Sequence, residues 1–273
     1  MKCEPLPSEP CLVCGFVESV CVNYTHLFNL TANFRNEIVI RKMDVLRSRN
    51  QLFYSYEPMI EDEEYYRVAY VNLDKPHFPG VVEGRSLDGG ETSLFNFGTL
   101  AIDQENEVVY LGGGRGIYKL EARNNNLLFY SSSEERITSL VFRGNVFFTM
   151  YPQDIILEKL ENSFPPVQSM KDIPVKNFMI DKTSAFVYLT TKGLFVSRDG
   201  VEQQLSENPF FRGMASDVTG KIYLWWIDTI YVAIVERDVK ASRLLKIFHM
   251  PRVKGVTFDR DNNMIVALDK KFS

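Results

Sequence analysis

The sequence has little of what most enzymes and nucleic-acid-binding proteins need. Only three of its 273 residues are histidines (His26, His77 and His249), and none lies in a recognisable arrangement with a nucleophilic serine or cysteine. The net charge is only −4 and no long basic run occurs, so nothing indicates a nucleic-acid partner. No apolar stretch reaches the ~20 residues of a membrane-spanning helix. These shortages argue against nucleophile–histidine catalysis, nucleic-acid binding and membrane insertion.

Cysteine is also scarce, and the first 21 residues hold all of it: Cys3, Cys11, Cys14 and Cys21. With no second Cys pair and only His26 nearby, a zinc site is disfavoured. An even number of cysteines in one short segment suits two disulfides in a secreted chain, although four cysteines allow three pairings.

Two glycosylation sequons follow the cysteines, at Asn23 and Asn29. No apolar run follows Met1, so we expect that a signal peptide has been removed. Residues 1–33 are therefore predicted to form a disulfide-bonded, glycosylated segment of a secreted, extracellular protein.

The rest of the chain is rich in aromatic and β-branched residues and repeats at steps of about forty residues. Each unit has an apolar strand, a polar turn, a strand with an aromatic residue, a short turn and another apolar strand. Examples are "TLAIDQENEVVYLGGGRGIYKL", "NFMIDKTSAFVYLTTKGLFVSR" and "GMASDVTGKIYLWWIDTIYVAI". Such a period is typical of the blades of a β-propeller.

Two sets of residues mark the units. The residues that open the first turn are Arg47, Asp103, Phe142, Asp181, Asp217 and Asp259, and the aromatics are Tyr54, Tyr110, Phe148, Tyr188 and Tyr223. Six units predict an all-β, six-bladed propeller over residues 34–273. The last unit is short, and the segment "NEIVIRK" before the first unit is expected to supply the strand that closes the ring.

The glycine-rich stretch "YLGGGRGIY", Tyr110 to Tyr118, could be mistaken for a phosphate-binding loop. It aligns with "YLTTKGLF" of a later unit, and the residues after it alternate as a strand does. A phosphate loop would be followed by a helix. We therefore predict a turn between strands, with space for a ligand beside it.

The repeated aspartates are expected to serve the blades, because a residue that recurs in every unit usually accepts backbone hydrogen bonds in a tight turn. A more specific pattern lies five residues before each turn-opening position. These positions hold Lys42, Gly98, Ile137, Lys176, Arg212 and Lys254, and Arg136 adjoins Ile137. If the first strand of each blade lines the channel, these cations form a ring at one mouth and favour an anionic ligand. Trp225 or Trp226 is expected to offer a stacking surface.

The size of the chain, its cysteine-containing N-terminal segment with sequons, and units such as "FMIDKTSAFVYLTTKGLFVSRDG" resemble the ommochrome-binding proteins of moths. The resemblance implies a secreted haemolymph protein that binds a flat, anionic aromatic pigment such as xanthommatin and does not convert it chemically. It also implies no catalytic residue, cofactor or metal. We expect a monomer with this pigment as its partner.

Two other functions stay open from the sequence. Six-bladed hydrolases of the senescence-marker or gluconolactonase type hold a divalent metal in the channel, but basic and apolar strand starts would repel one. A propeller face that binds another protein is the second alternative.

Overall fold

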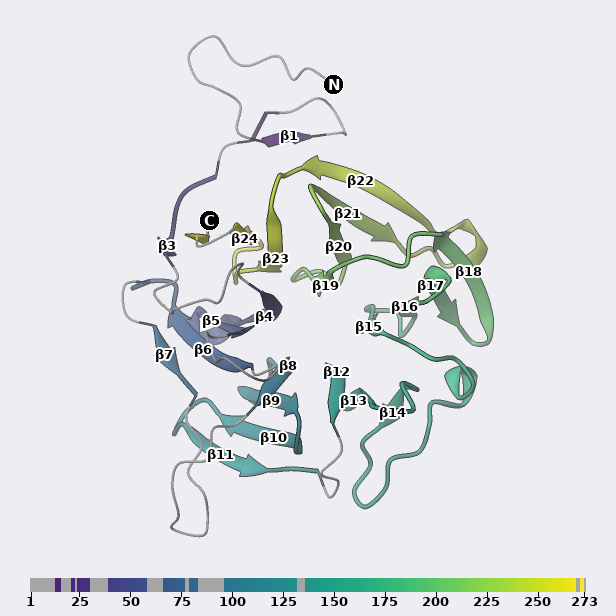
Figure 1. Ribbon diagram of the computed structural model, residues 1–273, viewed down its shortest axis with the longest axis horizontal. Helices are drawn as coiled ribbons and strands as arrows, with labels where there is room; N and C mark the ends of the chain where they lie inside the picture. Colours follow the sequence, from purple (N-terminus) through teal and green to yellow (C-terminus); the bar gives the residue numbers. More distant parts are fainter. Residues whose placement is uncertain are drawn as a thin grey trace.

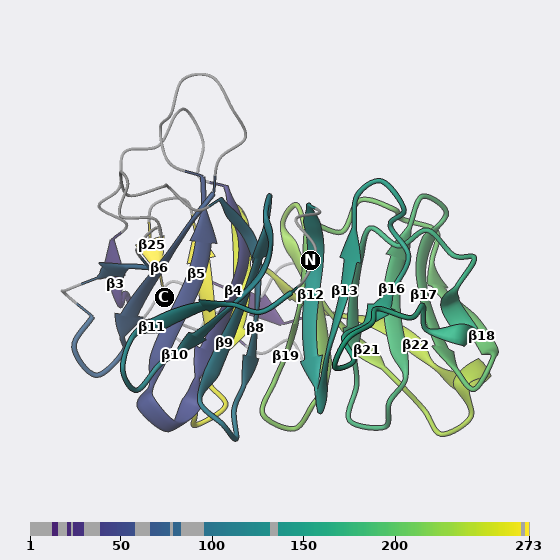
Figure 2. The same cartoon turned by 90° about the horizontal axis from the view of Figure 1, so that it is seen from below.

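The computed structural model describes residues 13–15, 21–22, 24–29, 39–57, 66–76, 79–82, 96–131, 136–268 and 271–272. Within them the strands form six sheets arranged around a central channel, as Figure 1 shows. In the side view the sheets stand next to one another with their inner strands running along the channel (Figure 2). Among the described residues, none of the helices has the length and apolar character needed to span a bilayer.

The first three sheets follow the chain from the inside of the ring outwards. The first contains β4 (Ile40–Leu46), β5 (Gln51–Tyr56), β6 (Arg67–Asn72) and β7 (Gly80–Val81). The second contains β8 (Phe97–Asp103), β9 (Val108–Gly113), β10 (Gly116–Glu121) and β11 (Asn126–Phe129). The third contains β12 (Ile137–Arg143), β13 (Asn145–Met150) and β14 (Leu157–Glu158).

The remaining sheets complete the ring. The fourth contains β15 (Asn177–Ile180), β16 (Phe186–Thr190), β17 (Gly193–Arg198) and β18 (Val201–Ser206). The fifth contains β19 (Gly213–Ser216), β20 (Ile222–Trp226), β21 (Thr229–Ile234) and β22 (Arg243–His249), extended by β1 (Val13–Gly15) and β2 (Cys21–Val22). The sixth contains β23 (Val253–Phe258), β24 (Met264–Leu268), β25 (Lys271–Phe272) and β3 (Phe28–Asn29).

The all-β propeller prediction is confirmed, with one correction. Five sheets are complete blades of four or more strands, whereas β12–β14 has three strands within the described residues. The six-bladed prediction is therefore corrected: five blades are complete, and the remaining sheet has three described strands. Pro165 and Pro166 follow β14, and proline lacks the N–H that a ladder needs. Only an isolated bridge joins Pro166 to Leu157.

The strand that closes the ring is not the predicted one. β3 pairs with β25, placing Phe28 opposite Phe272. The predicted segment "NEIVIRK" instead runs into β4, the innermost strand of the first sheet. β1, β2 and β3 all lie within residues 1–33, and each is hydrogen-bonded into one of the propeller's sheets.

Little of the predicted disulfide and glycosylation pattern falls on described residues. Cys3, Cys11 and Asn23 lie outside them. The backbones of Cys14 and Cys21 face each other across β1 and β2, but their side chains are outside the described part. Asn29 is exposed, and its Oδ1 lies 3.0 Å from His26 Nε2. The disulfides and glycans stay predictions.

The repeated aspartates serve the turns, as predicted. Asp181 Oδ1 accepts hydrogen bonds from the backbone N–H groups of Thr183 and Ala185, both at 2.8 Å. Asp259 Oδ1 accepts the equivalent bonds from Asp261 and Asn263, at 2.9 and 2.8 Å. Each carboxylate thus closes the turn between the first two strands of its blade.

Two of the repeated aromatics join neighbouring blades. Tyr110 of β9 stacks on Phe142 of β12, with ring centroids 5.6 Å apart and an interplanar angle of 13°. Tyr223 of β20 contacts Phe258 of β23 at 4.6 Å. These two aromatics pack on the first strand of the next sheet and so help to set the spacing of those blades. Tyr188 instead stacks on Phe195 of its own sheet.

Candidate functional site: two cavities in the channel

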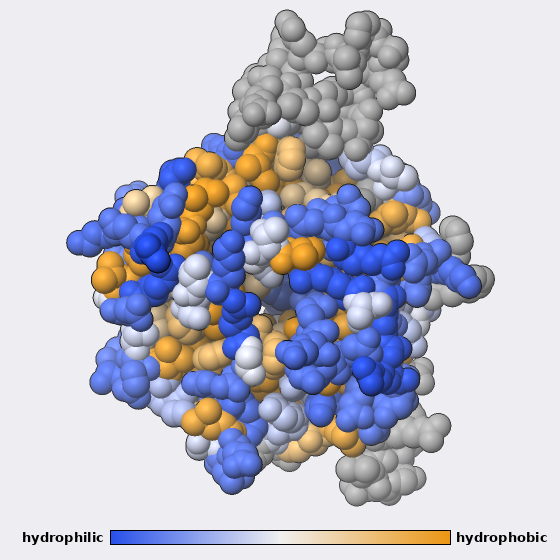
Figure 3. All heavy atoms as spheres, turned by 180° about the vertical axis from the view of Figure 1, so that it is seen from behind, coloured by the Kyte–Doolittle hydropathy of each residue, from blue (hydrophilic) through white to orange (hydrophobic). Residues whose placement is uncertain are grey.

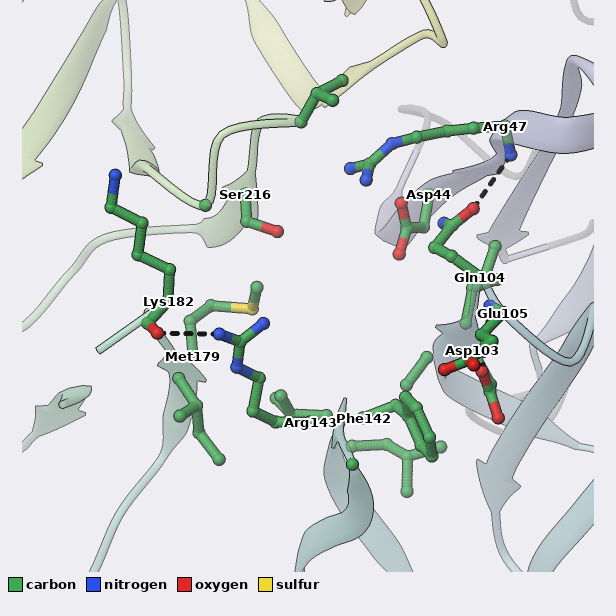
Figure 4. A pocket seen from close by; sticks show the side chains of 18 of the residues that line it. Asp44, Arg47, Asp103, Gln104, Glu105, Phe142, Arg143, Met179, Lys182 and Ser216 are labelled. Atoms are coloured by element: carbon green, nitrogen blue, oxygen red, sulfur yellow. Dashed lines mark hydrogen bonds between the residues drawn. The ribbon is translucent and has the colours of Figure 1, made fainter. Parts of the chain in front are cut away.

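The larger cavity in the described part of the channel has a volume of about 430 Å³. It lies where the inner strands β4, β8, β12, β15 and β19 run into their first turns. Figure 3 shows the face opposite to that of Figure 1, with hydrophilic residues gathered around a central hollow. Figure 4 looks into the cavity. Its apolar wall includes Leu100, Ile102, Leu140, Phe142, Met179 and Ile180.

Lys42 reaches across the channel from β4 to the opposite blades. Its Nζ donates to the carbonyl oxygen of Met214 at 3.1 Å and lies 3.4 Å from the sulfur of Met179. Burial lowers the pKa of Lys42, and the charge of Asp44 acts in the opposite direction. Burial likewise raises the pKa of Asp44, against the charges of Lys42 and Arg47. Burial thus disfavours the charged form of both residues, and each charge partly offsets this effect on the other.

Arg47 extends over the cavity from the end of β4 (Figure 4). Its backbone N–H donates to Gln104 Oε1 at 3.0 Å, and the Gln104 amide donates to the carbonyl of Val45 at 2.8 Å. The Arg47 Nε–H is buried, and within the described residues it has no hydrogen-bond partner. A buried donor of this kind costs stability unless a ligand or water accepts its hydrogen bond.

Two further cations, Arg143 and Lys182, line the cavity. They lie across it from the carboxylates of Asp44 and Glu105 (Figure 4). Arg143 Nη2 donates to the carbonyl oxygen of Lys182 at 2.8 Å, which holds the guanidinium in the cavity wall. Asp103 and Asp217 also line the cavity, but both carboxylates accept hydrogen bonds within their own turns. The lining therefore holds four cations and four carboxylates, of which Asp44 and Glu105 face the cations.

A second, smaller cavity of about 180 Å³ lies nearer the starts of the inner strands. Arg41, Arg136 and Lys176 line it, together with glycines from β8 and from the β9–β10 turn. The Arg41 guanidinium donates to Tyr66 Oη from Nε at 2.9 Å and from Nη2 at 2.6 Å, and lies 4.9 Å from the centre of the Tyr66 ring.

The strand pairing replaces one member of the predicted cation ring: Arg41 takes the position predicted for Lys42. Leu46, rather than Arg47, pairs with the first residue of the next strand as Asp103 does in the second blade. Arg41 lies five residues before Leu46. It stands at the point where the pairing register of β4 and β5 shifts, between Ile40 and Lys42. The residues at equivalent positions are Arg41, Gly98, Thr138, Lys176, Arg212 and Lys254. Lys42 lies one residue further along and lines the larger cavity.

The other predicted ligand-binding residues are divided between several places. Arg136 and Lys176 line the smaller cavity. Arg212 and Lys254 belong to the ring by register but line neither of the two described cavities. Trp225 is buried in the core, and a Cβ on Gly213 would lie 2.1 Å from its ring. Trp226 packs against another core cluster, so neither tryptophan borders a described cavity.

Sequence reasoning missed Arg47, Arg143 and Lys182 as lining residues of the larger cavity. Each of these residues lies at the end of an inner strand or directly after its turn-opening position. The repeat therefore contained the signal that could have identified them. Within the described residues, no three His, Cys, Asp or Glu side chains are grouped so as to hold a metal ion.

No family model matches the chain. It is 21% identical over 222 residues to a curated relative from Manduca sexta, covering 80% of this chain and 77% of that one. The relative is the ommochrome-binding protein. The predicted resemblance is confirmed.

Solved structures share the propeller fold at much lower identity. The WD40 repeats of RRP9 match with a TM-score of 0.58 and 9% identity, over 89% of this chain and 98% of that one. Streptogramin B lyase matches with a TM-score of 0.56 and 11% identity, over 90% and 94%. One of these propellers is named as an enzyme and the other as a repeat domain, so the fold alone assigns no activity.

Proposed function

We propose that the protein is a secreted, monomeric carrier for a flat, anionic aromatic pigment of the ommochrome class, such as xanthommatin, and that the pigment occupies the larger cavity. The observation that carries the proposal is a cavity with an apolar wall and two arginines, in a chain similar to an ommochrome-binding protein. Its volume of about 430 Å³ lies within the 300–1,000 Å³ range common for sites of small organic ligands.

The cavity offers both kinds of contact that such a pigment needs. Phe142 is held by its stack on Tyr110 and supplies an aromatic wall, and Leu100 and Met179 extend the apolar surface. Arg47 and Arg143 supply guanidinium groups, which form paired hydrogen bonds with carboxylates. The pigment's rings would lie against the apolar wall and its carboxylates would face the cations.

We infer binding without chemistry, so no residue is assigned a catalytic role and no cofactor or metal is invoked. The relative's name describes binding rather than catalysis. Secretion is proposed from the clustered cysteines and sequons of the N-terminal segment.

The proposal is tested by titrating xanthommatin into the protein and following pigment absorbance. Arg143→Gln and Arg47→Gln should each weaken binding by about tenfold or more, since a hydrogen bond to a charged group contributes roughly 1.5–3 kcal/mol. Lys171→Gln is the matched control, because Lys171 is exposed and lines neither described cavity. It should bind as the wild type does.

Variants of the cation ring separate the two mouths of the channel. Lys176→Gln and Arg212→Ala should leave pigment affinity unchanged, because neither residue lines the larger cavity. If they weaken binding while Arg143→Gln does not, the pigment binds at the strand-start mouth instead. No binding to any variant or to the wild type would overturn the proposed function.

A further inference from the structure

The larger cavity holds charges of both signs, and they lie on opposite sides of it. Figure 4 shows the carboxylates of Asp44 and Glu105 on one side and the side chains of Arg143 and Lys182 on the other. Arg47 extends into the cavity from the side of Asp44 (Figure 4). A purely anionic ligand would gain from the arginines, but the two carboxylates would repel it.

Asp44 has a carboxylate oxygen that is open to a ligand. Its Oδ1 accepts the backbone N–H of Val45 at 2.8 Å, whereas among the described residues its Oδ2 accepts no hydrogen bond. Lys42 Nζ donates elsewhere, to the carbonyl oxygen of Met214 at 3.1 Å. Burial raises the pKa of Asp44, so a cationic partner in the cavity would stabilise its charged form.

Glu105 adds a second carboxylate on the same side of the cavity. It is exposed in the first turn of the second blade, where its backbone N–H donates to Asp103 Oδ1 at 3.1 Å. Within the described part of the chain, its own carboxylate forms no hydrogen bond or ion pair. Asp103 and Asp217 differ, because their carboxylates accept hydrogen bonds in their own turns. Asp44 and Glu105 are therefore the carboxylates that can meet a ligand.

Arg47 places a positive charge on the same side as these carboxylates. Its backbone N–H donates to Gln104 Oε1 at 3.0 Å, and its buried Nε–H has no hydrogen-bond partner among the described residues. None of the ion pairs within the described ranges joins Arg47 to Asp44 or Glu105. The guanidinium therefore keeps donors for a ligand carboxylate.

A headgroup with a single charge would meet one favourable and one unfavourable partner here. A carboxylate alone would meet Arg47 but also two carboxylates, and an ammonium alone would meet the carboxylates but also Arg47. A group that has an ammonium and a carboxylate on one carbon atom can satisfy both kinds of partner. It is neutral overall, so it adds no net charge to a partly buried site.

We propose that the Arg47 side of the larger cavity is a subsite for an α-amino-acid headgroup. Arg47 binds the carboxylate of the headgroup, and Asp44 and Glu105 bind its ammonium. The attached aromatic ring lies against Phe142, and a second carboxylate at the far end of a longer ligand meets Arg143. The ligand class is an aromatic α-amino acid, either free or as part of a pigment. The inference rests on the proposed function only in placing an aromatic ligand in the larger cavity.

Calorimetric titration of the full chain with three related compounds tests the headgroup. L-Tryptophan has both charges, N-acetyl-L-tryptophan has only the carboxylate, and tryptamine has only the ammonium. We expect saturable binding of one L-tryptophan. Affinity for each analogue should be lower by about tenfold or more, because each loses a charge-assisted contact and keeps a charge that is repelled.

Two variants assign the contacts. Glu105→Gln should weaken L-tryptophan binding by about three- to fivefold, a modest loss because Glu105 is exposed, and should not weaken binding of N-acetyl-L-tryptophan. Arg47→Gln should weaken L-tryptophan binding by about tenfold or more, and should not weaken binding of tryptamine. Glu161→Gln is the matched control: Glu161 is exposed and lines neither described cavity, so affinity for L-tryptophan should not change.

Two results would overturn the headgroup subsite. One is that L-tryptophan binds no tighter than the analogues, or shows no saturable binding at about 10 mM, ten times the concentration that half-fills a millimolar site. The other is an equal effect of Glu105→Gln and Glu161→Gln. Thermal midpoints measured without ligand should agree among the variants, so a loss of binding is not a loss of folding.

Xanthommatin titrated in parallel separates this inference from the carrier function. Pigment binding without the L-tryptophan preference would remove the headgroup subsite and keep the carrier. The L-tryptophan preference without pigment binding would keep the subsite, assign the cavity to free aromatic amino acids and overturn the carrier. Competition between L-tryptophan and the pigment would assign the headgroup to the pigment.

Discussion

Replacing Asp181 by alanine should destabilise the protein far more than the same change at Asp259. Both carboxylates accept two backbone N–H bonds in equivalent turns, at 2.8–2.9 Å. Asp181 is only 5% exposed and also accepts from the Thr183 hydroxyl, whereas Asp259 is partly exposed. Asp259 in turn accepts from Asn263 Nδ2 at 2.9 Å, and Asp181 Oδ2 lies 3.9 Å from Arg198 Nη2, so the two turns differ in burial and in this ion pair.

The magnitude follows from what each truncation leaves behind. At Asp181 the N–H of fully buried Ala185 loses its carboxylate acceptor, with no solvent to replace it. Two or three charge-assisted bonds of roughly 1.5–3 kcal/mol, partly offset by relaxation, give a loss of about 3–4 kcal/mol. At Asp259 water can replace the carboxylate, and the loss should be about 1 kcal/mol.

Thermal unfolding followed by circular dichroism measures the difference. At roughly 2–4 °C per kcal/mol for a domain of this size, Tm should fall by about 6–16 °C for Asp181→Ala and about 2–4 °C for Asp259→Ala. Asp181→Asn, which keeps one acceptor oxygen, should lie between the wild type and Asp181→Ala. Equal losses at the two positions would refute the argument that burial sets the value of these turns.

Two further predictions concern packing and pH. Gly213→Ala should lower the free energy of unfolding by roughly 1–3 kcal/mol, because its Cβ would overlap the buried Trp225 ring. Gly114→Ala, in open space, should leave Tm unchanged. An unchanged stability of Gly213→Ala would contradict the packing around Trp225. Hydrogen bonds from Arg123 and two other side chains lower the pKa of Glu107 to about 2. The stability that Glu107 contributes should be complete above the unfolded pKa of about 4.3 and lost as pH falls towards 2. Urea unfolding of wild type and Glu107→Gln across this range checks it, and a constant difference down to pH 2 would argue against the shift.

The repeat predicted most of the fold because its aspartates and aromatics do the same physical work in several blades. Asp181 and Asp259 close equivalent turns, and Tyr110 and Tyr223 pack on the next blade. Ring closure by Phe28–Asn29 could not be read from the sequence, because a strand of two residues has no periodicity.

The site was predicted less well for a reason of register. The first unit lacks the aspartate that marks the turn elsewhere, so spacing alone points to Arg47 at the position that Leu46 holds. The same spacing puts Lys42 in the mouth ring, where Arg41 belongs. The bulge that adds a residue to the inner strands depends on pairing partners, which spacing along one strand does not reveal.

A crystal structure of the protein with xanthommatin bound would test the central claim most directly. The account predicts pigment density in the larger cavity, with the rings against Phe142 and carboxylates within hydrogen-bonding distance of Arg47 or Arg143. Density at the strand-start mouth, on the outer wall of the propeller, or nowhere on the chain would contradict it.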